Sequence, residues 1–399
     1  MHTLVEKEAR SSSRTTASSR RDGLILAAVV IGLNAVLFVL VQRANAGLLK
    51  GDFKMFYTAA VALRSGHAAD LYNRDYYISA QRQLLPSLPL ADVKTYTHPP
   101  YELLVFWPLS FLSYKAACYC WLAIAIALGM ICGRMLRAYA AVLGLFPFLA
   151  MLLEQQDSVL ALLLLIGCWR AWRGGREVLA GFLLGLALFK FQIVLPLALV
   201  LLFWRPAIWK GLAISSAIAV LLSVVLVGPA GMRSYTRYIS SMAHDSAASV
   251  SARYQMDPRT NATLRGLTYE IFSRGGESTP PVAARVMPFA VGLLDLLCLA
   301  AAARFMRSDA ALEAKFSVAV LSALLVSFHL LMHDLLWLAV PFVLLRGVRA
   351  RWPLLIFYLA PLVYLFYPAS QCWLALAILL SLVLILVPGA RRMAYDANS

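Results

Sequence analysis

Long apolar runs alternate with short polar turns along most of this chain. The first run, Leu24 to Val41, is unbroken and long enough to cross a bilayer as a helix with little tilt. Similar runs recur almost to the end of the sequence and predict about twelve transmembrane helices. The predicted spans lie near residues 24–43, 116–134, 139–153, 158–172, 178–190, 192–204, 210–228, 282–304, 315–329, 331–345, 353–367 and 371–388.

Several of these runs are short for a span. A helix of about thirteen residues rises only ~20 Å, whereas the hydrocarbon core is ~30 Å thick. The neighbouring runs 178–190 and 192–204, and likewise 315–329 and 331–345, are expected either to tilt or to turn back inside the membrane. Such a turn is tolerated where protein buries it or where it lines a water-filled cavity. The polar residues at these turns are Lys190, Gln192, His329, His333 and Asp334.

Two long polar segments interrupt the pattern and are predicted to be loops. The first covers residues 44 to about 115 and contains amphipathic stretches near Phe53 to Arg64 and Arg74 to Leu84. Its last part, Tyr101 to Ser113, predicts a short helix at the membrane interface. The second loop covers residues 229–281.

The composition assigns the chain to a class. Of its 399 residues 61% are hydrophobic and 14% are charged, and the mean hydropathy is +0.74. Soluble domains carry roughly a quarter charged residues, so the fold class expected is an all-α integral membrane protein with many spans. The net charge of +16 does not indicate nucleic-acid binding, because the basic residues form short clusters between apolar runs. The six cysteines lie in or beside apolar runs and suggest neither disulfides nor a zinc site.

The arginine clusters fall at every second turn and set the topology. Placing them in the cytoplasm puts both termini inside and both long loops outside. Residues 24–390 then form one polytopic membrane domain between two cytoplasmic tails, 1–23 and 391–399, of which the first is expected to be disordered. The first helix is expected to stay uncleaved, because its apolar run exceeds the roughly seven to fifteen residues of a signal-peptide core.

Asp52 is the leading candidate for chemistry. It lies in the polar loop just after the first span, close to the membrane surface and beside Lys54 and Tyr57. An acid there suits general-base catalysis, in which it takes the proton of an attacking hydroxyl. The alternative is a solvated acid or an N-cap for the helix that begins near Phe53.

Lys190 is the second candidate, because an apolar stretch surrounds it on both sides. A charge there costs about 2.5–3.5 kcal/mol, so a partner or a wet cavity is expected. A phosphate would be a natural partner, and snorkelling to an interface is the alternative. His329 and His333 lie four residues apart with Asp334 adjacent, which favours phosphate or sugar-hydroxyl contacts over a core role. No third protein ligand is obvious, so neither a metal nor a cofactor is expected.

Four weaker candidates lie in the two loops. His98 and Glu102 flank Pro99-Pro100, and Asn261 and Arg265 lie in the second loop. Each of them taken alone is as compatible with a solvated surface as with a site.

Taken together and in order, these segments resemble glycosyltransferase family 87. The similarity rests on Gly51 to Ala60 with Leu63 to Gly66, Tyr96 to Tyr101, Ala180 to Gly185, Lys190 to Gln192, Asn261 with Leu264 to Gly266, and Ser327 to Asp334. The resemblance implies a GT-C-type membrane fold and inverting transfer, on the extracytoplasmic side, of a hexose such as mannose from a polyprenyl-phosphate donor. It implies that Asp52 is the base and that the basic and histidine positions bind the lipid phosphate.

The chemistry of such a donor agrees with the residues available. A lipid phosphate leaves as an anion without a general acid, so one carboxylate and fixed cations suffice. We therefore expect a multi-pass glycosyltransferase of the bacterial plasma membrane that acts on a lipid-linked or cell-envelope acceptor. The alternative is a lipid or sugar transporter or flippase. Such proteins usually show inverted repeats, and this sequence shows no repeat.

Overall fold

A computed structural model describes residues 31–36, 38–39, 51–86, 88–244, 258–273, 281–359 and 371–387. Within these ranges the regular structure is helical, and no strand occurs. The two predicted tails lie outside the described residues, as do parts of the predicted spans 24–43 and 353–367.

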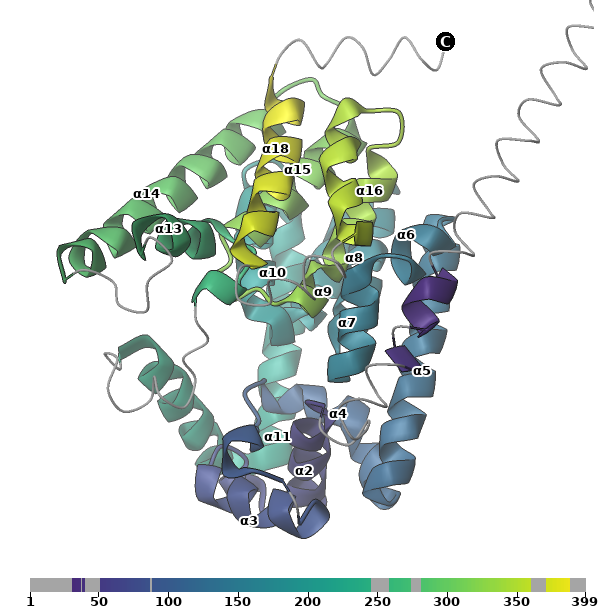
Figure 1. Ribbon diagram of the computed structural model, residues 1–399, viewed down its shortest axis with the longest axis vertical. Coiled ribbons are helices and arrows are strands. Elements are labelled where there is room, and N and C mark those ends of the chain that lie inside the picture. Colours follow the sequence, from purple (N-terminus) through teal and green to yellow (C-terminus); the bar gives the residue numbers. More distant parts are fainter. Residues whose placement is uncertain are drawn as a thin grey trace, which may run out of the picture.

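The loop before residue 114 folds into a small layer at one end of the molecule (Figure 1). The helices α2 (Phe53–Arg64) and α3 (Arg74–Leu84) have the bounds predicted from the sequence. The Asn73 side chain caps α3 by accepting a hydrogen bond from the backbone of Asp75. Most of α2 is buried, so it does not lie on a surface as an amphipathic helix would. Shorter turns complete the layer: η2 (Ala68–Asp70), η3 (Leu90–Asp92), η4 (Pro100–Glu102), α4 (Leu103–Phe106) and η5 (Trp107–Phe111).

Three helices are long and apolar enough to cross a membrane. They are α5 (Tyr114–Leu136), α11 (Ala207–His244) and α14 (Pro281–Met306), with spanning parts Tyr114–Leu136, Ala207–Ser240 and Val286–Met306. Much of their apolar surface points outward, as at Phe289 (80% exposed) and Val225 (73% exposed). Apolar side chains exposed in this way need lipid around them, so the chain is a membrane protein. The predicted end of a span at residue 228 coincides with a break in α11 at Gly228, but helix continues through to His244.

A bent pair supplies a fourth apolar segment. The helices α9 (Glu177–Leu186) and α10 (Phe191–Leu202) are joined by η6 (Leu188–Lys190), and the axis turns by 63° at the break. The predicted break between the two short runs is present, and a bend of 63° is compatible with a broken span or with a re-entrant loop. The helix α9 packs closely on α11, and a Cβ on Gly181 would lie 1.8 Å from the carbonyl oxygen of Ile208. Only glycine permits that approach.

The remaining helices are shorter. They are α6 (Tyr139–Leu143), α7 (Phe146–Glu154), α8 (Ser158–Arg173), η7 (Pro258–Thr260), α13 (Leu264–Ser273), α15 (Leu312–Leu325), η8 (Met332–Leu338), α16 (Ala339–Leu344), η9 (Arg349–Leu355), η10 (Gln371–Trp373) and α18 (Leu374–Leu386). Twelve complete spans are not confirmed: the described residues contain three long apolar helices, or four if the bent pair counts as one.

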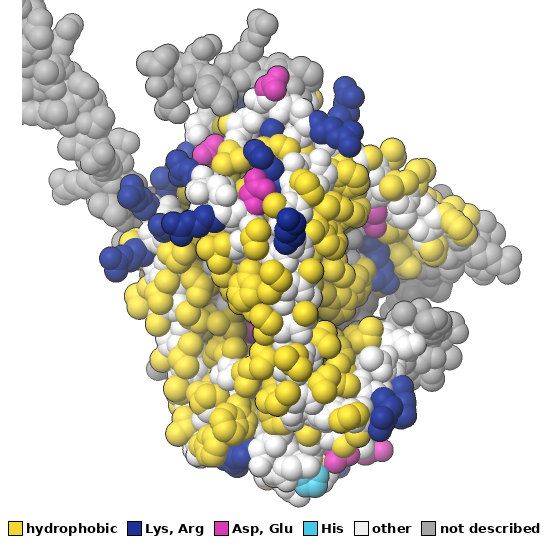
Figure 2. Space-filling view, turned by 180° about the vertical axis from the view of Figure 1, so that it is seen from behind, with side chains coloured by type: hydrophobic (Ala, Val, Ile, Leu, Met, Phe, Trp, Pro, Cys, Tyr) yellow, Lys and Arg dark blue, Asp and Glu magenta, His cyan; other side chains and the backbone are white. Residues whose placement is uncertain are grey.

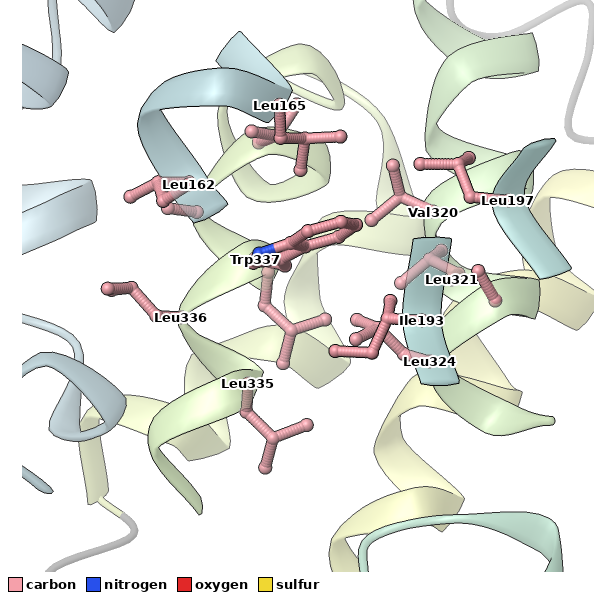
Figure 3. Packing of buried hydrophobic residues seen from close by; sticks show 14 of the residues in the cluster. Leu162, Leu165, Ile193, Leu197, Val320, Leu321, Leu324, Leu335, Leu336 and Trp337 are labelled. Atoms are coloured by element: carbon pink, nitrogen blue, oxygen red, sulfur yellow. The ribbon is translucent and has the colours of Figure 1, made fainter. Parts of the chain in front are cut away.

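The core of the membrane part lies where these short helices meet. Figure 3 shows Trp337 of η8 among leucines from α8 and apolar side chains from α10 and α15, all members of one buried cluster. A second apolar cluster joins α2 and the turns after it to α5.

The Arg-rich turns lie together at the end of the molecule opposite α2 and α3. Figure 2 shows most of the visible Lys and Arg side chains at that end, with an apolar surface below them. Contacts join turns that are distant in sequence: Arg346 Nη2 donates to the carbonyl of Arg137, and Arg205 Nη1 lies 3.3 Å from Glu177 Oε1. This grouping agrees with the alternation that the arginine clusters predicted.

Candidate active site

Asp52 lies at the start of α2 with its side chain turned toward a neighbouring turn. Its backbone N–H donates to the carbonyl of Glu154 (2.7 Å), and its Oδ2 accepts a hydrogen bond from Gln156 Nε2 (2.6 Å). The Nζ of Lys94 lies 3.9 Å from Oδ1, and the Asp52 side chain is 21% exposed. The side chain makes no capping hydrogen bond to α2. The structure therefore disfavours the N-cap role, and it leaves Asp52 accessible.

The segment Glu154 to Ser158, which we call the α7–α8 turn, organises the site. Gln155 adopts a left-handed conformation with φ of 58°, which ends α7 and reverses the chain before α8. The indole Nε1 of Trp121 donates to the carbonyl of Gln155 (3.2 Å), so α5 holds the turn from one side. The sharp reversal lets adjacent side chains reach different neighbours: Gln156 contacts Asp52, and Asp157 points into the interior.

Lys190 and two carboxylates form the centre of that interior. Lys190 Nζ lies 2.8 Å from Asp157 Oδ1 and 3.0 Å from Asp334 Oδ1, and all three residues are at most 3% exposed. Lys190 is the last residue of η6, at the break between α9 and α10. The sequence suggested a phosphate as the partner of Lys190, and the structure places two acids there instead. Snorkelling is wrong for a side chain this deeply buried.

His98 and Glu102 extend the buried cluster toward the outer loop. His98 Nδ1 lies 2.7 Å from Glu102 Oε2 and 3.2 Å from Asp157 Oδ2. Burial alone would lower the pKa of His98, but the two carboxylates outweigh it and raise that pKa to about 10. Burial raises the pKa of Glu102 to about 8, against the opposing effect of His98. The hydroxyl of Tyr96 donates to the carbonyl of Pro99 and lies 3.3 Å from Glu102 Oε2.

His333 and Asp334 close the cluster from the other side. Asp334 Oδ1 accepts a hydrogen bond from Ser158 Oγ (2.9 Å) in addition to its contact with Lys190. His333 Nδ1 pairs with the carboxylate of Glu154, whose side chain is 36% exposed, and its Nε2 lies 3.5 Å from Asp334 Oδ1. A continuous set of ionisable groups thus runs from His98 to Glu154. We call His98, Glu102, Asp157, Lys190, Asp334, His333 and Glu154 the buried ion cluster.

Asn261, Arg265 and His329 meet beside this cluster. The backbone N–H of Leu330 donates to Asn261 Oδ1 (2.7 Å), and Arg265 Nη1 donates to the carbonyl of Phe328 (3.0 Å). The segment 328–330 is therefore held by the start of α13 and the turn before it. His329 is half-buried, and it lies between Phe328 and Leu330, which make these two contacts.

Three predicted site residues, Lys54, Tyr57 and Gln192, have no contact with Asp52 or with the buried ion cluster among those described above. Lys54 Nζ donates to the carbonyl of Gly51 (3.1 Å) and is almost fully buried. The Tyr57 hydroxyl donates to the carbonyl of Leu112 (2.8 Å), where it ties α2 to the end of η5. Gln192 is half-buried on α10, two residues after Lys190.

His98, Glu102 and Asp157 also have the composition of a small metal site. Each offers one potential ligand atom, and these atoms lie within 4.8 Å of one another. Glu102 Oε2 pairs with His98, and Asp157 Oδ1 pairs with the ammonium of Lys190. We therefore describe these residues as part of an ion cluster and do not identify them as metal ligands.

Sequence reasoning missed four residues that the structure brings to the site. They are Glu154, Gln156, Asp157 and Lys94, none of which the sequence analysis names as a candidate. One signal was available: the four residues Glu154 to Asp157, which separate the apolar stretches 139–153 and 158–169, are all polar. A polar group of that kind between two short apolar runs indicates a buried polar contact as readily as an exposed turn.

Comparison with known proteins supports one family. The model of glycosyltransferase family 87 matches residues 96–327, which is more than half of the chain. No curated protein and no solved structure shows a significant match. The matched segment contains most of the buried ion cluster, whereas Asp52 precedes it and His333 and Asp334 follow it.

Proposed function

The chain belongs to glycosyltransferase family 87 and is a multi-pass membrane protein, and from this premise we propose its reaction. A hexose, which we propose to be mannose, moves from a polyprenyl-phosphate donor to a hydroxyl of a lipid-linked or cell-envelope acceptor. The transfer inverts the anomeric carbon and takes place at the extracytoplasmic face of a bacterial plasma membrane. The GT-C-type fold is part of the same proposal.

The observation that carries the proposal is the placement of Asp52. Its carboxylate is partly exposed, hydrogen-bonded by one buried amide, and located where the outer layer meets the membrane helices. An acid in that position can take a proton from an acceptor hydroxyl while the hydroxyl oxygen attacks the sugar. The buried acids nearby are already engaged with Lys190 and the histidines, so they are less suited to this task.

The donor phosphate requires cations on the side of the sugar opposite the base. Lys190 is almost fully buried between two carboxylates, so a direct contact with phosphate would require these ion pairs to open. Arg265 is better placed, because one of its five N–H donors is used on the carbonyl of Phe328 and its side chain is half-exposed. We propose that Arg265 and His329 bind the phosphate, and that Lys190 and His333 hold the framework behind them.

The test is a paired measurement on purified Asp52→Asn protein. The substitution keeps the size of the side chain and an oxygen that can accept from Gln156, but removes the proton acceptor. We expect transfer from polyprenyl-phosphate-mannose to extracted membrane lipids to fall by about 10²–10⁴. Donor affinity should stay near normal, because the phosphate is bound elsewhere.

A matched control is Asp75→Asn, which removes an exposed acid from α3 in the same outer layer. Its transfer rate should equal that of the parent protein. Near-normal transfer by Asp52→Asn would exclude Asp52 as the base. Loss of both transfer and donor binding would instead assign Asp52 a structural role.

A further inference from the structure

Gln156 is buried directly against the carboxylate proposed as the base. Its Nε2 donates to Asp52 Oδ2 over 2.6 Å, and the residue is 5% exposed. An ionised carboxylate can only accept hydrogen bonds, so the amide of Gln156 must present its nitrogen and not its oxygen to Asp52. The contact therefore has a defined direction.

The two oxygens of Asp52 differ in their surroundings. Oδ2 is occupied by the short hydrogen bond from Gln156, whereas the nearest ionic neighbour of Oδ1 is Lys94 Nζ at 3.9 Å. That distance is too long for a hydrogen bond, so Lys94 does not fix the position of Oδ1. Oδ1 is the oxygen left to receive a proton.

The backbone around Gln156 restricts its movement. Its own N–H donates to the carbonyl of Met151 (2.9 Å), and the preceding residue is held by Trp121. The following residue, Asp157, is anchored by Lys190 and His98. A shift of Gln156 would also move Asp157 and disturb the buried ion cluster. These contacts therefore limit the movement of the Gln156 amide.

We propose that Gln156 is a positioning residue that holds the carboxylate of Asp52 with Oδ1 directed at the acceptor hydroxyl. This inference rests on the proposed role of Asp52 as the base. In the transfer step the hydroxyl O–H bond breaks and its proton goes to Oδ1. The hydroxyl oxygen forms a bond to the sugar carbon, and the bond from that carbon to the donor oxygen breaks. The electron pair of that bond leaves on the phosphate.

The decisive variant is Gln156→Glu, which replaces the donor by a second carboxylate. Two carboxylates this close cannot both ionise easily, so they bind a shared proton as the pH falls. The protonated form can donate the hydrogen bond that the amide donated. The charged and titratable groups around the pair are Lys94, Lys54 on α2, Tyr114 on α5 and Glu154 on α7.

We expect kcat of Gln156→Glu to be reduced on the order of 10–100-fold at pH 8, since small misplacements of a reacting group cost about this much. The deficit relative to the parent protein should shrink between pH 8 and pH 5.5, as the shared proton binds. Gln156→Leu should show a similar loss without recovery at acid pH. Donor affinity should change by less than about twofold in both variants.

Ser158→Ala is the matched control, because it alters the same turn but contacts Asp334 and not Asp52. Its pH profile should keep the shape of the parent profile. If the deficit of Gln156→Glu is independent of pH, or if Gln156→Leu keeps a normal kcat, the positioning role is wrong. If Asp52→Asn also keeps normal transfer, the proposed base itself has failed. An inactive Asp52→Asn beside a normal Gln156→Leu overturns only the inference about Gln156.

Discussion

Replacing Lys190 by methionine removes the ammonium that pairs with Asp157 and Asp334. Methionine has a similar length and no charge, so the variant preserves most of the packing around the break between α9 and α10. The two carboxylates would then lie in the interior without their principal cation. His98 and His333 would remain as partners at 3.2 Å from Asp157 and 3.5 Å from Asp334.

The expected cost can be worked from the burial of the three groups. Removing one partner of a buried ion pair typically destabilises a protein by about 3–5 kcal/mol, because the remaining charge is left uncompensated. An unfolding entropy of about 2.1 cal/mol/K per residue gives about 0.8 kcal/mol/K for a chain of this length. The thermal midpoint of Lys190→Met should therefore fall by about 4–6 °C. Total stabilities are about 5–15 kcal/mol, so the variant should still fold.

The assay is thermal unfolding of purified protein in one detergent, followed by tryptophan fluorescence. Lys115→Met is the control, because it removes an exposed lysine from α5 and should leave the midpoint unchanged. Adding Asp157→Asn to Lys190→Met should recover part of the loss, with a coupling of about 0.5–3 kcal/mol. A midpoint equal to that of the parent would refute the buried ion pairs. Donor affinity measured well below the midpoint separates the roles, since a direct phosphate contact would weaken binding in a protein that is still folded.

Two further predictions concern the outer layer. His98 and Glu102 both have folded-state pKa values above those of the unfolded chain, so the stability they contribute is present at low pH and is lost as the pH rises through about 8 and 10. The thermal midpoint should fall between pH 7 and pH 10. If a Glu102→Gln variant loses as much stability near pH 8 as the parent protein does, Glu102 is not the group responsible. Gln81 donates to the carbonyl of Lys94 and accepts from its N–H, so Gln81→Leu should cost about 1–3 kcal/mol and speed trypsin cleavage after Lys94. An unchanged cleavage rate would show that other contacts hold this loop.

The elements foreseen most accurately are those whose pattern is local. The bounds of α3 follow from its cap at Asn73 and from helical periodicity, those of α2 follow from periodicity alone, and α5 and α14 follow from long apolar runs. The burial of α2 could not be foreseen, because Phe56 stacks on Phe106, which lies fifty residues further along the chain. Amphipathicity indicates that a helix has two faces but not whether a second layer covers the polar one.

The short runs after residue 139 were harder to interpret. Their lengths were recognised as insufficient for a straight span, and the bend between α9 and α10 has the expected position at Lys190. Hydropathy does not specify whether such a run continues into its neighbour, bends or ends, because tertiary contacts decide it. The glycines of α9 give one such contact, since they admit the backbone of α11 and fix the first half of the bent pair.

The composition of the site shows why half of it could be predicted from the sequence. Lys190, His333 and Asp334 were conspicuous because each is a charge within apolar sequence, and the cost of burying a charge makes such residues informative. Glu154, Gln156 and Asp157 form a short polar turn that nothing in the local sequence marks as part of a site. Their contacts join residues more than a hundred positions apart, as between Gln156 and Asp52 or between Glu154 and His333. The charges explain the pairing in retrospect: Lys190, His98 and His333 need acids inside the protein, and the turn between α7 and α8 supplies two of them. The same turn also carries Gln156, whose amide donates to Asp52. The segment that supplies acids to the buried cations is therefore also the segment that contacts the proposed base.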